Sequence, residues 1–299
     1  MTVKNDTVAL VFAGLVLLLW STVATAFKIA LRYWTAFELL FLASAVSFIA
    51  LSVLMLIRRK FPDLKTLPRN DLKKLILAGI LNPLIYYLIL FKAYELLPAQ
   101  YAQAINFTWP LVLSLAAMLL RQEAFRYLRI AALCISFGGA VILVLGGKQV
   151  PGGINPGGVL LAFSSTLFWV FYWMISKTVR SDALISLWIP FGISTLILGL
   201  TAILFFRPES FSLPGIAAAV YVGLFEMSIT FLLWLNALRL SSSTALISNF
   251  IYAVPFLSLV FIRHVLKEAV QPATVIGLLL ILGGILLQML IRNKKTGTS

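Results

Sequence analysis

The sequence predicts an all-α integral membrane protein whose ten transmembrane helices form two inverted five-helix repeats around a central cavity. Of its 299 residues, 61% are hydrophobic and only 11% are charged, which is outside the range of soluble globular proteins. Its apolar runs are continuous, and each can cross about 30 Å of hydrocarbon as a helix. Such runs exclude a membrane barrel, whose strands alternate. In addition, polar and small residues recur at fixed spacing in the two halves of the chain.

Ten apolar segments, separated by short loops, can each form a spanning helix. In chain order they are Val8 to Leu31, Ala36 to Ile57, Leu72 to Leu96, Ala99 to Leu120, Tyr127 to Gly146, Gly157 to Thr178, Leu184 to Phe206, Pro214 to Leu238, Ser242 to Ile262 and Pro272 to Ile291. Little of the chain remains for a soluble domain.

An internal repeat divides the chain into residues 1–150, with spans one to five, and residues 151–299, with spans six to ten. Four residues late in the first half recur at one spacing: Pro110 with Pro255, Glu123 with Glu268, Gly138 with Gly283 and Gly139 with Gly284. Further pairs, at slightly different spacings, are Asn82 with Glu226, Ala93 with Ala237, Trp20 with Trp169 and Lys28 with Lys177. An odd number of spans per repeat gives the two halves opposite orientations in the membrane. The glycine pairs are expected to be points of close helix packing.

The distribution of basic residues predicts the orientation. Most of the 24 lysines and arginines fall in segments that become cytoplasmic if the N-terminus is inside, as the positive-inside rule requires. We therefore expect a multi-pass protein of the cell (inner) membrane with both termini in the cytoplasm. This topology accounts for the net charge of +14, so the expected partner is the lipid bilayer and not nucleic acid.

Few residues are available for catalysis or metal binding. The chain has one cysteine, Cys134, and one histidine, His264, which argues against a metal centre, a cofactor or a catalytic nucleophile of these types. A glycine-rich phosphate loop for ATP is also absent from the sequence. The glutamates outside Glu226 are scattered, which disfavours, without excluding, an integral-membrane lipid-modifying enzyme. A sensor or scaffold is a third class, and the oligomeric state is left open.

Glu226 is the acidic residue placed deepest in any span. A carboxyl group at that depth costs several kcal/mol unless it is protonated, paired or hydrated. It could bind a cationic amine, carry a coupling proton, or be neutral and structural. Functional interpretations are favoured because ionisable groups inside membranes are usually functional.

The remaining candidates for binding a small-molecule substrate lie at paired mid-span positions, where inverted repeats place their site. They are amides and aromatic rings, namely Trp20, Asn82, Tyr86, Asn106, Trp109, Trp169, Tyr172, Trp173, Asn249 and Tyr252. Asn82 and Tyr86 are expected to share one helix face because they are four residues apart. Pro83, Pro110 and Pro255 are expected to break their helices. For any single residue, a purely packing role is about as plausible.

Several of these segments resemble the drug/metabolite transporter superfamily, specifically its ten-helix EamA-type members. The resemblance rests on Leu19-Trp20-Ser21-Thr22, Asn106 through Pro110, Glu123, Phe168-Trp169 with Tyr172 and Lys177, and Pro255 with Glu268. Within the superfamily, these segments look like the aromatic amino acid exporter branch. The resemblance implies export of aromatic amino acids or bulky amphipathic compounds by alternating access. Organic cations and nucleotide sugars are alternative substrates.

Overall fold

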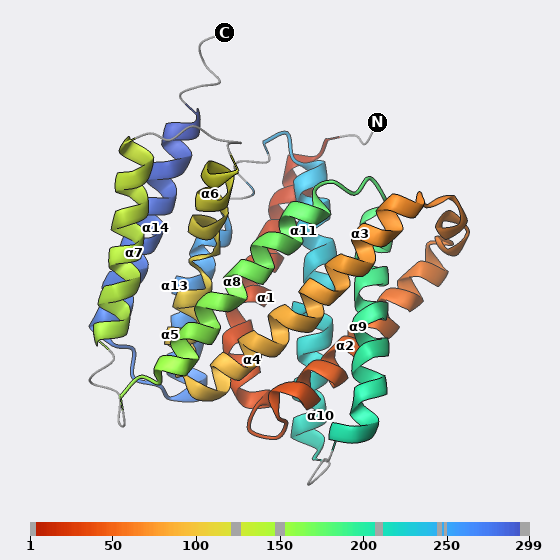
Figure 1. The fold of residues 1–299 in the computed structure, drawn as a ribbon, viewed down its shortest axis with the longest axis horizontal. Helices are drawn as coiled ribbons and strands as arrows, with labels where there is room; N and C mark the ends of the chain where they lie inside the picture. The colour runs from red at the N-terminus through yellow and green to blue at the C-terminus, as the bar shows by residue number, and fades with distance from the viewer. Residues whose placement is uncertain are drawn as a thin grey trace.

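The computed structural model describes residues 4–120, 127–146, 153–206, 212–243, 247 and 250–293. Throughout these ranges the regular structure is helical, without strands. Seven helical rods are long and apolar enough to cross a membrane, and three shorter apolar helices accompany them. The predicted all-α membrane fold is therefore confirmed. The start of α1 and the end of α14 lie at the same end of the molecule (Figure 1).

Six of the ten rods are single helices, and they follow the predicted spans within about two residues at most ends. They are α1 (Asp6–Ala30), α2 (Ala36–Ile57), α7 (Tyr127–Gly146), α8 (Pro156–Ser176), α9 (Ala183–Phe205) and α14 (Pro272–Asn293). Their starts carry ordinary N-terminal signals. Thr35 and Glu38 form a capping box at α2, and the Asn155 side chain caps α8, whose first residue is Pro156.

The other four rods are interrupted near their middle. The third consists of α3 (Arg69–Gly79), η2 (Ile80–Ile85) and α4 (Tyr86–Leu96), and the eighth of α10 (Leu213–Tyr221), η4 (Val222–Glu226) and α11 (Ile229–Leu240). Both η2 and η4 are π-helical. The fourth consists of α5 (Ala99–Asn106) and α6 (Trp109–Leu119), and the ninth of η5 (Phe250–Ala253), α13 (Val254–Phe261) and η6 (Ile262–Leu266). A short helix, η1 (Phe61–Thr66), lies between α2 and α3.

Helix packing is the same when the helices of one half are replaced by their counterparts in the other half. α1 packs along α11, and its counterpart α8 packs along α4, the counterpart of α11. The second rod, α2, packs along its own counterpart α9, and α7 packs along α14 at one side of the molecule (Figure 1). These pairings are those of the two-repeat fold that the sequence predicts.

Small residues bring α7 and α14 into close contact. A Cβ atom added to Gly139 would lie 2.6 Å from the carbonyl oxygen of Gly277, and one added to Gly284 would lie 2.5 Å from that of Ala132. The repeat spacing relates Gly139 to Gly284 and Ala132 to Gly277. The contact of Gly139 with Gly277 and the contact of Gly284 with Ala132 are therefore equivalent in the repeat. Gly138 and Gly283, by contrast, have open space in front of them. Close packing therefore holds for Gly139 and Gly284 but not for Gly138 and Gly283.

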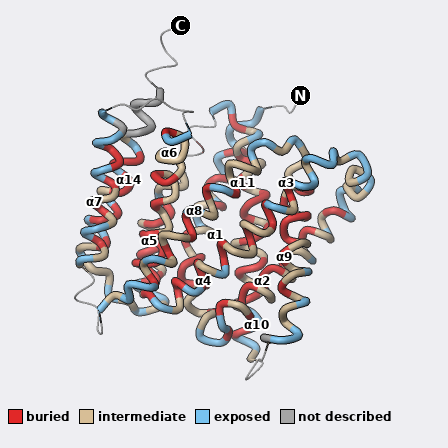
Figure 2. The backbone as a smooth tube through the Cα atoms, viewed as in Figure 1, coloured by how far each residue is buried: buried red, intermediate tan, exposed pale blue. Residues whose placement is uncertain are grey.

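Burial separates the interior from the belt that lipid would cover. Buried residues gather on the faces that the helices turn toward one another (Figure 2). Large apolar side chains such as Ile49, Ile57 and Ile203 are exposed, as expected where hydrocarbon is the solvent. Trp34 differs from a lipid anchor, because it is buried and its indole N–H donates to the Gly215 carbonyl at 2.8 Å.

Candidate functional site

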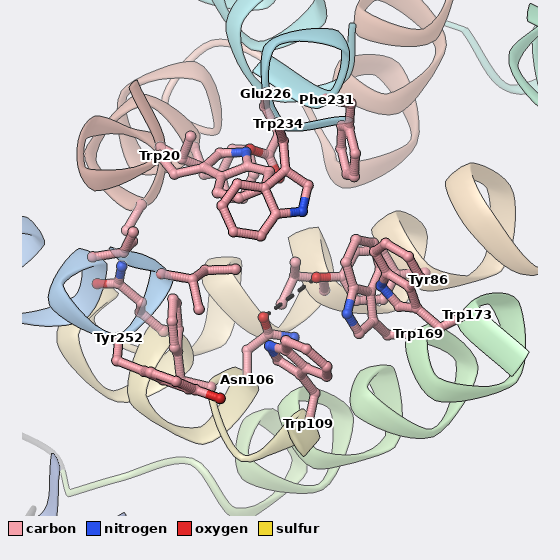
Figure 3. A pocket seen from close by; sticks show the side chains of 18 of the residues that line it. Trp20, Tyr86, Asn106, Trp109, Trp169, Trp173, Glu226, Phe231, Trp234 and Tyr252 are labelled. Atoms are coloured by element: carbon pink, nitrogen blue, oxygen red, sulfur yellow. Dashed lines mark hydrogen bonds between the residues drawn. The ribbon is translucent and has the colours of Figure 1, made fainter. Parts of the chain in front are cut away.

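A cavity of about 300 Å³ lies among the helices of both halves. Side chains from α1, α4, α5, α6, α8, α11 and the ninth rod line it, together with Glu226 at the end of η4. Eight of the predicted site residues are among them: Trp20, Tyr86, Asn106, Trp109, Trp169, Trp173, Glu226 and Tyr252. Figure 3 shows these side chains arranged around one space.

The exposed part of the described cavity lining lies at the end of the molecule where α8 and α11 finish, called here the mouth end. Lys177, which follows the last residue of α8, is exposed and lines the cavity there. At the opposite side the lining residues Phe27, Tyr94 and Gln103 are at most 5% exposed. Among the described lining residues, exposure is thus at the mouth end, and buried side chains close the other end.

Trp169 is the centre of an aromatic wall formed by both halves. Its ring lies 4.8 Å from Tyr86, 6.4 Å from Trp109 and 6.0 Å from Trp173, measured between centroids. Tyr86 and Trp169 are only 34° from parallel, whereas the other two rings stand near 75° to Trp169. Offset and edge arrangements of this kind are favourable for aromatic pairs and for a flat ligand placed among them.

A second aromatic group faces this wall. Trp20 of α1 contacts Phe231 and Trp234 of α11, with centroids 5.6 and 5.7 Å apart. Phe231 also reaches Trp169 at 6.0 Å, which connects the two groups. Phe231 and Trp234 are not among the site residues predicted from the sequence. A usable signal existed, because Trp234 lies eight residues, slightly more than two helical turns, after Glu226.

One amide is fixed between the two halves. Asn106 donates through Nδ2 to the Ser165 hydroxyl at 3.0 Å, and its Oδ1 accepts from the Tyr86 hydroxyl at 3.3 Å. Ser165 is on α8 and Tyr86 on α4, so Asn106 connects three helices. These bonds orient the amide and hold Tyr86 against Trp169.

Among the described side chains that line the cavity, Glu226 is the only acidic one. Its Oε1 accepts a hydrogen bond from the Tyr87 hydroxyl at 2.8 Å. Its Oε2 is buried and has no hydrogen-bond partner among the described residues, although the Trp20 indole lies beside the carboxyl group (Figure 3). A buried acceptor without a partner is costly, and a ligand with an N–H donor would satisfy it.

The other predicted site residues lie elsewhere. Asn82 is 3% exposed and does not line the cavity. Tyr172 packs behind Trp169 at 5.7 Å and lines a neighbouring pocket of about 170 Å³. Asn249 lies outside the described residues.

The predicted helix breaks fall where rods are interrupted. Pro83 is inside η2, while Pro110 and Pro255 are the second residues of α6 and α13. The described residues contain no group of three or more His, Cys, Asp and Glu side chains that could hold a metal ion.

Comparison with known proteins agrees with this architecture. The model of the EamA-like transporter family matches residues 7–145 and 156–290. The chain therefore belongs to the EamA-like transporter family, as its resemblance predicted, and it is a membrane transporter.

Two curated relatives are similar along most of their length. An uncharacterized transporter of Archaeoglobus fulgidus is 26% identical over 274 residues, which cover 89% of this chain and 93% of the relative. The uncharacterized transporter YvbV of Bacillus subtilis is 24% identical over 219 residues, 71% of this chain and 70% of the relative. A solved structure described only as a crystal structure of protein has a TM-score of 0.64 at 23% identity, covers 97% of this chain and 99% of its own, and shows the shared fold.

Proposed function

We propose that the protein is a secondary exporter of small amphipathic metabolites, with aromatic or other amino acids as the first substrate class, acting by alternating access. The observation that carries this proposal is an aromatic cavity lined by one carboxyl group, whose buried Oε2 has no hydrogen-bond partner among the described residues. The two aromatic groups provide faces for a flat apolar body. The oxygen provides a partner for an ammonium group.

Cavity size supports a small solute. A volume of about 300 Å³ is at the lower limit for pockets that enclose drug-sized ligands. An amino acid with an aromatic side chain fits that limit better than a nucleotide sugar does. Glu226 also favours substrates with a positive charge, so simple organic amines are the second candidate class.

The proposed location is the cell (inner) membrane, with both termini in the cytoplasm. The basic residues between 58 and 74 support this orientation through the positive-inside rule. The mouth end would then face the cytoplasm, and the cavity would load from the cell interior. Loading from that side supports export.

Counterflow in proteoliposomes tests the proposal. Vesicles with purified protein are loaded with phenylalanine, and uptake of labelled phenylalanine is followed against protein-free vesicles. Unlabelled 2-phenylethylamine, 3-phenylpropionate, leucine, a quaternary ammonium ion and a nucleotide sugar are added as competitors. We expect accelerated exchange that the amine inhibits more strongly than the carboxylate does, because Glu226 binds the ammonium group.

The competitors also separate the alternatives. Exchange driven only by nucleotide sugars would contradict the substrate class and leave the family unchanged. A lipid-modifying enzyme or a scaffold predicts no substrate-dependent counterflow with any compound. Coupling to protons would appear as phenylalanine movement driven by an imposed pH gradient, and that movement should disappear when Glu226 is replaced by Gln.

A further inference from the structure

A second cavity lies at the end opposite the mouth. It has a volume of about 370 Å³ and is lined by Lys28, Leu31, Arg32, Glu95, Leu266 and Glu268. Four of these six residues are charged, so we name this cavity the charged vestibule. In the described part of the chain, no residue lines both this vestibule and the central cavity. Phe27 and Tyr94 line the central cavity, whereas their immediate neighbours Lys28 and Glu95 line the vestibule.

The barrier between the two cavities is an aromatic cluster held by one lysine. Phe27 lies 4.8 Å from Phe91 and 5.2 Å from Tyr94, centroid to centroid. The Lys28 ammonium group donates to the carbonyl oxygens of Tyr94 at 2.7 Å and Leu97 at 3.0 Å. These carbonyls are at the C-terminal end of α4, where unpaired acceptors and the helix dipole favour a cation. Lys28 therefore joins the end of α1 to the end of α4 across the barrier.

The repeat gives this contact a counterpart at the mouth end. Lys177, directly after α8, corresponds to Lys28 of α1, because the two lysines lie eight residues after Trp169 and Trp20 respectively. The spacing that pairs Ala93 with Ala237 also pairs Tyr94 with Leu238 and Leu97 with Ser241. The equivalent contact would thus join Lys177 to the carbonyls of Leu238 and Ser241.

That equivalent contact is not formed in this structure. Lys177 is exposed and lines the central cavity together with Leu238. The Ser241 carbonyl accepts instead from Lys4 at 2.7 Å, and the Arg239 carbonyl accepts from the same ammonium group at 3.0 Å. Lys28 thus binds its two carbonyls in this structure, whereas Lys177 does not bind the carbonyls of Leu238 and Ser241.

We propose that Lys28 and Lys177 are gate residues that close opposite ends of the pathway in alternation. When the mouth end is open, Lys28 closes the vestibule end by binding the carbonyls of Tyr94 and Leu97. When the vestibule end opens, that contact breaks and Lys177 binds the carbonyls of Leu238 and Ser241. This inference rests on the proposed alternating access and names the groups that perform it.

The vestibule makes release of Lys28 feasible. Glu268 accepts through Oε1 from the Ala99 backbone N–H at 3.0 Å, and its Oε2 is buried with no hydrogen-bond partner in the described ranges. Glu95 and Glu268 line the same polar cavity as Lys28. An ammonium group that leaves the α4 carbonyls thus remains near two carboxylates.

Accessibility from each side of the membrane tests the exchange. Cys134, the single native cysteine, is replaced by Ser, and Leu90→Cys places a thiol at a buried position of the central cavity. An impermeant maleimide is applied to right-side-out and inside-out vesicles, and the ratio of labelling rates reports which end is open. Lys28→Met and Lys177→Met are introduced singly and together. Lys65→Met and Lys73→Met, at exposed positions outside both cavities, are the controls.

Opposite effects are expected from the two gate variants. Loss of one charge-assisted contact should shift the ratio roughly tenfold toward the vestibule end in Lys28→Met. Lys177→Met should shift it toward the mouth end, and the double variant should return near the parent value. Lys28→Arg should keep the parent ratio, because it retains a cationic donor. Monodispersity in detergent serves as the folding check for every variant.

An unchanged ratio in Lys28→Met, or shifts of the same sign in both single variants, would overturn the gate. The labelling ratio requires no substrate, so it can be measured even if the proposed substrates fail in counterflow. If phenylalanine shows counterflow but the labelling ratio does not respond to Lys28→Met and Lys177→Met, the gate proposal alone is overturned. A shifted ratio without counterflow by any amino acid would overturn the substrate proposal alone.

Discussion

The carboxyl group of Glu226 has one oxygen bound by Tyr87 and one buried oxygen without a hydrogen-bond partner in the described part of the chain. Glu226→Gln keeps the size of the side chain and removes its charge. We expect at least a tenfold loss of apparent affinity for amine-bearing substrates, because a desolvated charge pair is worth several kcal/mol. Competition by 2-phenylethylamine in proteoliposomes measures this loss.

Asp63→Asn is the matched control for Glu226→Gln. Asp63 pairs with Lys60 in the segment between α2 and α3, away from the cavity. This variant removes one carboxylate and should leave transport unchanged. Equal competition by the amine in the parent protein and Glu226→Gln would remove Glu226 from substrate binding.

Trp169 contacts rings from α4, α6 and α11 and is therefore central to the aromatic lining of the cavity. Trp169→Phe preserves an aromatic face but shortens it. We expect transport of tryptophan and phenylalanine to weaken by a few-fold to tenfold, since an aromatic pair contributes about 0.5–1.5 kcal/mol beyond its burial. The apparent Km in counterflow is the measurement.

Trp188→Phe distinguishes a cavity effect from a general loss of tryptophan packing. Trp188 packs against Phe48 at 5.4 Å and donates to the Ser52 hydroxyl, outside the central cavity. It should lower thermal stability without changing the apparent Km. A Trp169→Phe variant with an unchanged Km for every aromatic substrate would contradict the proposed wall.

At the residue scale, cavity residues on regular helices were more predictable from the sequence than residues in the interrupted segments. Pairing mid-span positions between the repeats selected Trp20 and Trp169, whose place depends on helix periodicity alone. It placed Asn82 on the face of Tyr86 by counting four residues, but Asn82 has φ −148° and ψ 121° inside a π-helical segment. A π turn and a non-helical residue change the rotation between the two positions, so the four-residue rule fails there.

At the scale of elements, the contact between α7 and α14 gives a prediction with an internal control. A Cβ atom at Gly139 would lie 2.6 Å from the Gly277 carbonyl, whereas nothing lies within 4 Å of one at Gly138. Gly139→Ala should destabilise the protein by about 1–3 kcal/mol through overpacking. Gly138→Ala should be neutral or slightly stabilising, because alanine is the better helix former.

Thermal unfolding in detergent, followed by tryptophan fluorescence, compares the two alanine variants. A lower midpoint for Gly138→Ala than for Gly139→Ala would contradict the observed register of these helices. Gly284→Ala provides an independent repeat of the test, because Gly284 faces Ala132 and Ser136. It should resemble Gly139→Ala, its partner in the repeat.

The positions of the spans were largely predictable because each apolar run has to satisfy its backbone within itself in lipid. The interruptions in the middle of spans were only partly predictable. Pro83 signals the break in the third rod, but η4 in the eighth rod contains no proline. There, Ser228 and Thr230 bond back to carbonyls of Gly223 and Phe225 and thereby replace helical hydrogen bonds. That compensation depends on side-chain geometry that hydropathy does not encode.

At the scale of the whole molecule, the opposite orientation of the repeats places equivalent loops at opposite ends. The loop after α1 and the loop after α8 follow the same span of each repeat, and these helices finish at different ends (Figure 1). Alkaline phosphatase fused at Arg32 should be active outside the cell, whereas a fusion at Arg180 should be inactive. A fluorescent protein, which matures inside, should show the reverse pattern.

Fusions at Lys60 and Ser212 extend this topology test to the loops after the second and seventh spans. Lys60 should report the inside and Ser212 the outside, because each further span changes the side. If all four assignments were reversed, the inverted fold would stand while the cytoplasmic termini and the direction of export would be wrong. Activity on the same side at Arg32 and Arg180 would contradict the inversion itself, and with it the pairing of Lys28 and Lys177 at opposite ends of one pathway.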